Sequence, residues 1–98
     1  MFGKILCVEQ DVAVRKSRCA ILKHSGYDAA SASPRVAEIV LRGRKFDLVV
    51  ISRLSNNFDL HRILNLADGA EVLVLEQLTR PSELLSLVAE RLDRQRKA

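Results

Sequence analysis

Three polar residues that directly follow two mostly apolar runs are the residues of this chain best placed to do chemistry. Glu9 and Gln10 follow the run 4–8, and Ser52 follows the run 47–51. A serine hydroxyl attacks a substrate only when a neighbouring base accepts its proton, and Glu9 could serve as that base. A hydrolase or phosphatase also needs a group that orients the base and a site for the oxyanion, and we can assign neither. We therefore expect that the chain is not an enzyme.

The two runs that carry these residues are typical of strands buried on both faces. Both are apolar at successive positions, as strands of a parallel sheet are. In an open parallel sheet, the carboxyl ends of the central strands meet at the functional crevice. We therefore expect Glu9, Gln10 and Ser52 to lie close together.

The rest of the chain alternates between strand patterns and helix patterns. This alternation predicts βαβ units with right-handed crossovers and one parallel sheet, and hence an α/β fold. The expected inner faces include Val14 in the first helix and Val36 in the second. The expected elements are strands at 4–8, 27–31, 47–51 and 70–75, and helices at 12–25, 34–43, 58–67 and from 79–82 onward.

Length and composition indicate one domain spanning residues 1–98. The chain has 48% hydrophobic residues, enough for one core, and no apolar stretch long enough to cross a membrane. Met1 is followed almost at once by the first predicted strand, without the pattern of a signal peptide. We expect a cytoplasmic protein in which Cys7 and Cys19 are reduced and partly buried.

The net charge of +4 comes largely from three basic clusters, at 15–18, 42–45 and 94–97. Cations at helix ends are stabilised by the helix dipole, which accounts for the second and third clusters. The alternative is a nucleic-acid-binding surface, which needs the clusters on one face together with groups that read bases. Only four aromatic residues are present, so we favour solvated helix ends.

Four segments resemble the receiver domain of bacterial two-component response regulators. Residues 4–11 (KILCVEQD), with Arg15 four positions on, resemble the opening of that domain. The other matching segments are 22–27 (LKHSGY), 46–51 (FDLVVI) and 80–85 (RPSELL). The resemblance covers nearly the whole chain and implies a flavodoxin-like, three-layer fold with strand order 2-1-3-4.

Receiver domains transfer a phosphoryl group from a sensor kinase to an aspartate, with Mg²⁺ held by an acidic pair. The resemblance places the acidic pair at Glu9 and Gln10 and the phosphoryl acceptor at Ser52. It places the lysine–proline step of the family at Arg80 and Pro81. The hydroxyl that normally ends the fourth strand falls near Glu76, whose charge would repel a phosphoryl group.

These replacements predict a degenerate receiver domain that needs no metal or other cofactor. Mg²⁺ prefers anionic oxygen ligands, and this site retains Glu9, with Asp11 as the one nearby carboxylate that could help. A serine also cannot attack phosphorus unaided as an ionised aspartate does. We therefore expect a protein–protein interaction module in bacterial signal transduction that is not switched by aspartyl phosphorylation, with the nucleic-acid-binding module as the alternative. The expected partner is a sensor kinase or another signalling protein.

Receiver domains usually have five strands and five helices, so one helix–strand unit is missing between Leu75 and Arg80. The strand at 71–76 then becomes a candidate edge strand, and an uncovered apolar edge can pair with another chain. We expect a homodimer formed by this strand and the last helix. The alternative is that residues 77–79 cover the edge as a short strand. The expected interface residues are Val72, Val74, Glu76, Leu84 and Val88.

Overall fold

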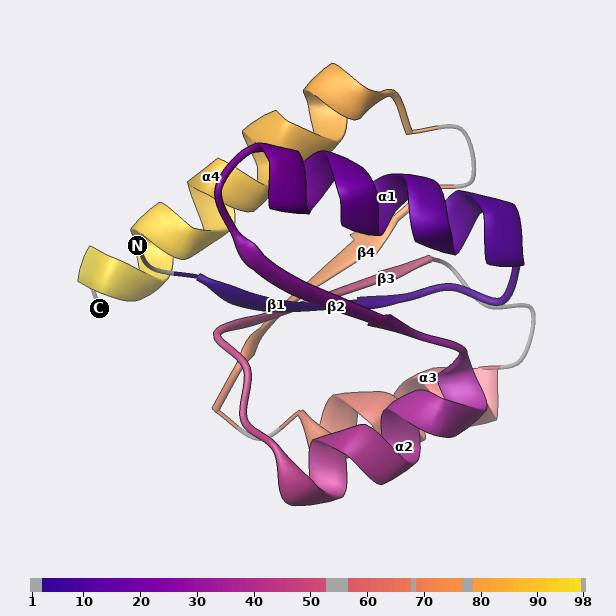
Figure 1. The fold of residues 1–98 in the computed structure, drawn as a ribbon. Coiled ribbons are helices and arrows are strands. Elements are labelled where there is room, and N and C mark those ends of the chain that lie inside the picture. Colours follow the sequence, from indigo (N-terminus) through magenta and orange to yellow (C-terminus); the bar gives the residue numbers. More distant parts are fainter. Residues whose placement is uncertain (1–2, 53–56, 68, 77–78, 98) are drawn as a thin grey trace.

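The computed structural model describes residues 3–52, 57–67, 69–76 and 79–97. Within them, strands and helices alternate along the chain (Figure 1). The elements are β1 (Lys4–Val8), α1 (Val12–His24), β2 (Asp28–Ala32), α2 (Pro34–Gly43), β3 (Leu48–Ser52), α3 (Asn57–Leu66), β4 (Glu71–Leu75) and α4 (Pro81–Lys97). The order and type of all eight confirm the expectation from the sequence, and most boundaries agree within one residue.

The four strands form one parallel sheet in the order β2-β1-β3-β4. This order confirms the α/β, flavodoxin-like fold with strand order 2-1-3-4. The central strands β1 and β3 pair in a register that sets Val8 opposite Ile51. Every residue of β3 is buried, as are the last four of β1, because helices cover both faces of the sheet.

Two helical layers cover the sheet, with α1 and α4 on one face and α2 and α3 on the other (Figure 1). Alternate residues of β1 contribute to the two cores: Ile5 and Cys7 to the core under α1 and α4, and Leu6 and Val8 to the core under α2 and α3. Both cysteines are buried and unbridged. In the part of the chain described here, no helix is long and apolar enough to cross a membrane.

Side-chain caps fix where the first two helices begin. Asp11 Oδ1 accepts a hydrogen bond of 3.0 Å from the amide of Val14, and Ser33 Oγ accepts one of 3.3 Å from the amide of Val36. Pro34 occupies the first turn of α2, where its missing N–H costs nothing. Asp11 is therefore the N-cap of α1.

Two expected inner-face residues lie at the surface instead. Val14 is 36% exposed and Val36 is 47% exposed. The buried positions of α1 are Arg18, Cys19 and Leu22. The inner face of α1 therefore includes a charged residue, and the apolar pattern alone misplaced it.

The strand β4 lies at the edge of the sheet, as expected. Val74 and Glu76 are exposed and Val72 is half-buried. Leu84 and Val88 are not surface residues: they are 2% and 0% exposed and belong to the core under α1 and α4. Assigning these two residues to a dimer interface was therefore wrong, because the apolar face of α4 packs in this core. The expected cover strand, apart from Thr79, lies outside the described residues.

Candidate functional site

Two of the three residues expected to lie close together, Glu9 and Ser52, do so at the carboxyl end of the sheet. Glu9 follows β1, Ser52 ends β3, and these strands are hydrogen-bonded neighbours. The Ser52 residue is 8% exposed and the Glu9 side chain is 12% exposed. A hydroxyl and a carboxylate therefore lie largely out of water at the carboxyl end of the sheet.

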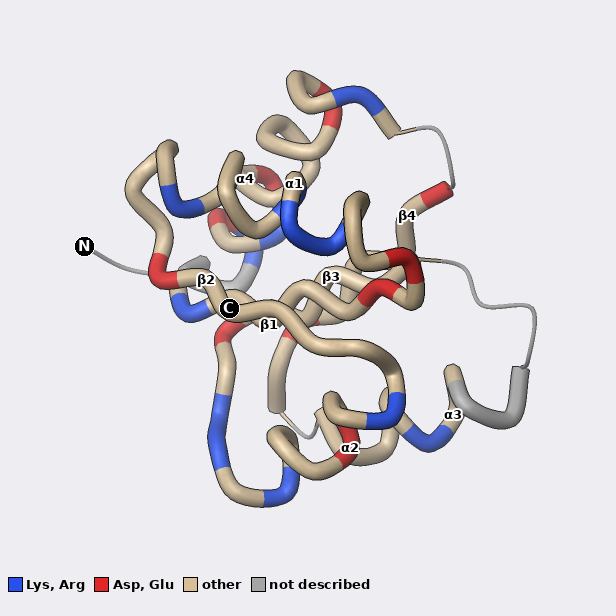
Figure 2. Tube along the Cα trace, turned by 45° about the vertical axis from the view of Figure 1, so that its right-hand side comes forward, with Lys and Arg blue, Asp and Glu red and all other residues tan. Residues whose placement is uncertain are grey.

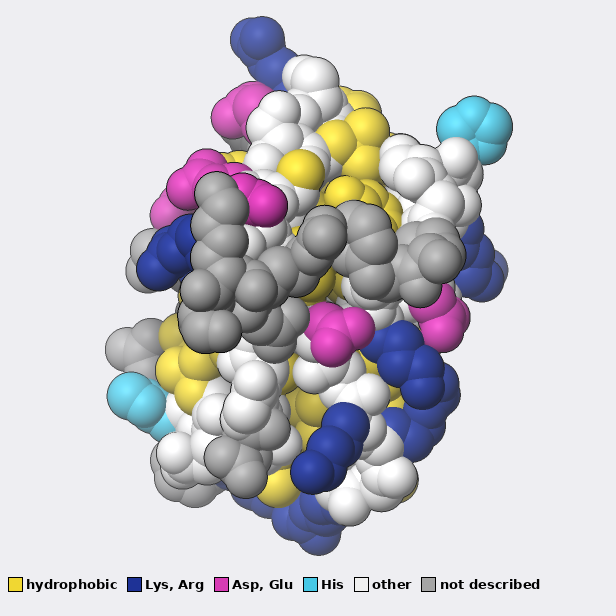
Figure 3. All heavy atoms as spheres, turned by 90° about the vertical axis from the view of Figure 1, so that its left-hand side faces the viewer, with side chains coloured by type: hydrophobic (Ala, Val, Ile, Leu, Met, Phe, Trp, Pro, Cys, Tyr) yellow, Lys and Arg dark blue, Asp and Glu magenta, His cyan; other side chains and the backbone are white. Residues whose placement is uncertain are grey.

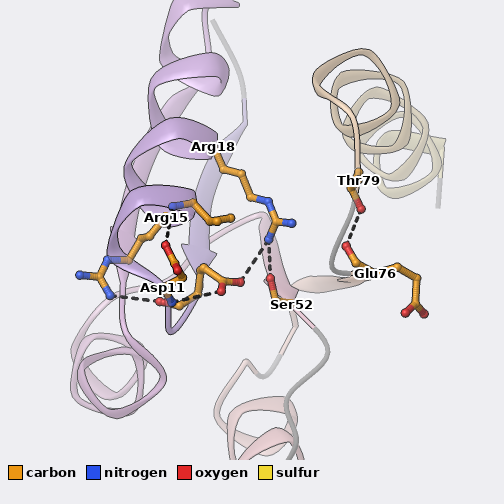
Figure 4. A network of polar contacts seen from close by, with 8 residues as sticks. Asp11, Arg15, Arg18, Ser52, Glu76 and Thr79 are labelled. Atoms are coloured by element: carbon orange, nitrogen blue, oxygen red, sulfur yellow. Dashed lines mark hydrogen bonds and ion pairs between the residues drawn. The ribbon is translucent and has the colours of Figure 1, made fainter.

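The side chain of Arg18 joins these two residues (Figure 4). Its Nη1 donates a hydrogen bond to Ser52 Oγ and another of 3.3 Å to Glu9 Oε2. The Arg18 side chain is only 7% exposed. Charge-assisted hydrogen bonds of this kind are stronger than neutral ones, and losing one partner leaves a largely buried charge unpaired.

Further contacts hold Glu9 in place. Its Oε1 accepts a hydrogen bond of 3.1 Å from the amide of Asp11, and its backbone amide donates to Ala32 O at 3.1 Å. Its backbone carbonyl accepts a hydrogen bond of 3.0 Å from Arg15 Nη1. The carboxylate is thus fixed from both sides, by α1 and by the turn that precedes α1.

The geometry of α1 explains why Arg18 points inward. Residues four apart lie on one face of a helix, so Arg18 shares a face with Leu22, which is fully buried. The Asp11 cap sets the start of this helix and hence the direction of that face. The sequence prediction missed Arg18 because it counted this residue only as part of the basic cluster at 15–18. Its spacing from Leu22 was the signal that could have placed it.

The remaining predicted site residues lie outside this network. Gln10 is exposed in the turn before α1. The Arg80 side chain is exposed, and its Nε lies 4.0 Å from Glu83 Oε1. Pro81 is the first residue of α4. The Glu76 carboxylate points away from Ser52 in Figure 4, while its backbone carbonyl accepts a 2.7 Å hydrogen bond from Thr79 Oγ1.

This set of residues does not fit Mg²⁺. The ion needs several hard oxygen ligands, whereas Glu9 Oε2 and Ser52 Oγ both already accept hydrogen bonds from a guanidinium. A cation placed between them would meet the positive charge of Arg18. Within the described ranges, no three His, Cys, Asp or Glu side chains gather where they could hold a metal ion.

The site is equally unsuited to nucleophilic attack. The group that contacts Ser52 Oγ is a permanent cation, which cannot accept the hydroxyl proton. The nearby thiol of Cys7 is also inert, because burial raises its pKa to about 12. Among the described residues, the contact of Ser52 Oγ with Arg18 provides no base for the hydroxyl.

The structure also changes the reading of the basic clusters. Arg18 leaves the first cluster, because its guanidinium is buried. Lys and Arg residues occur in both helical layers and in the connection from α2 to β3 (Figure 2). On the face shown in Figure 3, acidic side chains lie beside several of the basic ones. Among the described residues, the basic side chains are thus spread over several elements.

Comparisons with solved structures give the fold a precedent. The chain is similar to a response regulator receiver domain protein from Methanospirillum hungatei, with a TM-score of 0.72, 20% identity, and coverage of 99% of this chain and 98% of that chain. It is similar to a response regulator receiver protein from Sinorhizobium medicae, with a TM-score of 0.74, 14% identity, and coverage of 94% and 95%. It is also similar to the chemotaxis response regulator CheY4 of Vibrio cholerae, with a TM-score of 0.67, 15% identity, and coverage of 93% and 99%.

These similarities confirm the fold expected from the four matching segments, which is the receiver fold in a shortened form. At identities of 14 to 20%, they concern the fold and leave the chemistry to the residues of this chain. No protein-family model matches the chain, and no curated protein matches its sequence.

Proposed function

We propose that this chain is a degenerate receiver domain, a protein–protein interaction module of signal transduction that aspartyl phosphorylation does not switch. One observation carries the proposal: Arg18 is bonded to the residues at the acceptor position and at the acidic-pair position. The module acts without metal or other cofactor and has no enzyme activity. It works in the cytoplasm of a bacterium.

The Arg18 network supports the proposal because a side chain of the protein supplies the positive charge that Mg²⁺ supplies in a receiver domain. A positive charge next to the carboxylate at position 9 is provided by a side chain that cannot dissociate. The guanidinium also donates a hydrogen bond to the hydroxyl at position 52. These contacts form without phosphorylation, which suits a docking module that needs no phosphoryl switch.

The decisive experiment is phosphorylation by a small donor. The purified protein is incubated with Mg²⁺ and acetyl phosphate, and its intact mass is then measured. We expect the unmodified mass, because position 52 offers no carboxylate and no activated hydroxyl. A stoichiometric phosphoryl adduct that disappears in Ser52→Ala would overturn the proposal.

A matched control shows that the reagent works. A phosphorylatable receiver domain, treated in parallel, is expected to gain the adduct. A triple variant of this chain, Gln10→Asp, Arg18→Ala and Ser52→Asp, removes the internal cation and restores the two carboxylates. Gain of the adduct by this variant, but not by the parent chain, would identify these three positions as the cause.

The homodimer remains part of the proposal, with β4 and the exposed residues Val74 and Glu76 as its contact. One feature of the edge opposes free pairing: Arg91 Nη1 donates a hydrogen bond of 2.8 Å to the backbone carbonyl of Val72. Such a contact protects part of an edge strand from pairing. Dimerisation through β4 therefore uses the edge beyond Val72 or displaces Arg91. A sensor kinase or another signalling protein is the second partner we propose.

A further inference from the structure

A groove of about 450 Å³ lies beside the Arg18 network, between α1 and the beginning of α4. Its walls are largely apolar and include Val14 and Ile21 of α1 and Leu84 of α4. Arg18, Thr79 and Arg80 also line it. The exposure of Val14, which the apolar pattern did not predict, follows from its position in this groove. A concave, mostly apolar site of this size with a few polar groups is typical of small-molecule binding.

Arg18 offers the groove hydrogen-bond donors that the network does not use. Its Nη1 makes both network contacts, while Nε and Nη2 donate to none of the residues that the structure describes. In Figure 4, the guanidinium nitrogen of Arg18 without a dashed contact points away from Ser52 and toward the side on which Thr79 is labelled. The Nε and Nη2 hydrogens of an arginine form a parallel pair that matches the two oxygens of a carboxylate. The Arg18 side chain, which is 7% exposed, therefore lines the groove with an edge that pairs with none of the described residues.

We infer that the groove binds a small organic carboxylate with an apolar body, such as a medium-chain fatty acid. The carboxylate lies on the unused edge of Arg18, and its chain lies along Val14, Ile21 and Leu84. The binding is non-covalent and does not depend on phosphoryl chemistry, so it stands apart from the proposed function.

The surrounding charges favour an anion at this end of the groove. Arg80 is an exposed cation whose contact with Glu83, at 4.0 Å between two exposed side chains, is weak. Arg80 can therefore turn toward a bound carboxylate. Glu9 opposes an anion, but the bond between Glu9 and Arg18 engages a different nitrogen of the guanidinium. Thr79 Oγ1 donates its proton to Glu76 O and therefore offers the carboxylate no hydrogen bond.

The test is an NMR titration of the full chain, labelled with nitrogen-15, with three probes that separate the two parts of the ligand. Octanoate carries both parts, acetate carries the head group alone, and octanol carries the body alone. We expect saturable one-to-one binding of octanoate, with shifts confined to α1 and the beginning of α4. Acetate and octanol are each expected to bind at least tenfold more weakly. Equal binding of octanoate and octanol, or of octanoate and acetate, would overturn the inference.

Two variants test the assigned residues separately. Arg18→Gln is expected to weaken octanoate binding about tenfold, because it removes a charge-assisted pair of hydrogen bonds. Val14→Trp fills the groove and leaves the Arg18 network untouched, so it is expected to abolish binding with the fold intact. Ile39→Ser, on the exposed face of α2, is the matched control and is expected to bind as the parent does. Undiminished binding by Val14→Trp would refute the site whatever Arg18→Gln does to folding.

Discussion

Arg18 is a cation held inside the protein by two partners, and its removal should be costly. In Arg18→Met, the Glu9 carboxylate, whose side chain is 12% exposed, loses its ion-pair partner. We expect the free energy of unfolding to fall by about 2 kcal/mol. Ser52→Ala removes a single hydroxyl and should cost about 1 kcal/mol. Urea denaturation of both variants measures the difference.

A double variant distinguishes an ion pair from ordinary packing. In Glu9→Gln combined with Arg18→Met, neither charge is left alone, so the combined loss should be smaller than the sum of the single losses. Strict additivity would mean that the contact between Arg18 and Glu9 contributes nothing specific.

Cys7 gives the stability a dependence on alkaline pH. Burial raises the pKa of its thiol from 9.0 to about 12, so between these values the thiol is protonated in the folded state and ionised in the unfolded state. The folded state then binds more protons, and stability falls as pH rises through this window. The slope is at most about 1.4 kcal/mol per pH unit for one group.

Urea denaturation at several pH values between 8.5 and 10.5 measures this slope, with Cys7→Ala as the control. The variant lacks the thiol at position 7 and should show a shallower decline than the parent. An identical decline in both proteins would assign the effect to other groups.

The sequence pattern predicted where the site lies more accurately than it predicted which residues form it. The two apolar runs placed Glu9 and Ser52 together, because the carboxyl ends of parallel strands meet. They could not reveal that a third residue, Arg18, would join them. The charge of Arg18 favours a side chain in solvent, whereas its helical spacing from Leu22 favours the buried face of α1. In the folded protein the Arg18 side chain is buried.

At the scale of the elements, the exposed edge strand β4 is the feature with a measurable consequence. Val74 is 37% exposed on this strand, and we expect the dimer to form there. Val74→Lys places a charge on the edge and should shift the protein to monomer in sedimentation equilibrium. Ile39→Lys, on α2, is the matched control and should remain dimeric.

Arg91 provides a second test of the same edge. Arg91→Ala frees the carbonyl of Val72 for pairing and should tighten the dimer, at a cost of about 1 kcal/mol in folding stability. A parent protein that is monomeric at all accessible concentrations, together with a monomeric Arg91→Ala, would contradict dimerisation through β4.

The order of the elements was predictable because apolar periodicity differs between strands and helices. Inner-face assignments were less accurate where a helix carries more apolar residues than the sheet can cover. Val36 illustrates this: α2 buries Pro34, Ala37 and Leu41 and leaves Val36 at the surface. Leu84 and Val88 show the converse, since residues assigned to an interface were needed by the core.

For the whole molecule, the buried Arg18 guanidinium predicts that Mg²⁺ does not change the folding stability. A ligand that binds the folded state raises stability in proportion to the logarithm of its concentration over Kd. Because Glu9 and Ser52 are already bonded to Arg18, 10 mM MgCl2 should shift the melting temperature by less than about 1 °C. Calorimetry with and without the salt checks this, and an equal ionic strength of KCl is the control.

Because Arg18 is part of α1, its charge stays at the site, and this affects how long a signal lasts. An aspartyl phosphate hydrolyses, so the rate of hydrolysis limits the lifetime of each phosphorylated receiver. A guanidinium attached to the helix backbone cannot leave, so under the proposed function hydrolysis sets no such lifetime. The strength and duration of the output would then follow the number of copies in the cell, set by synthesis and proteolysis.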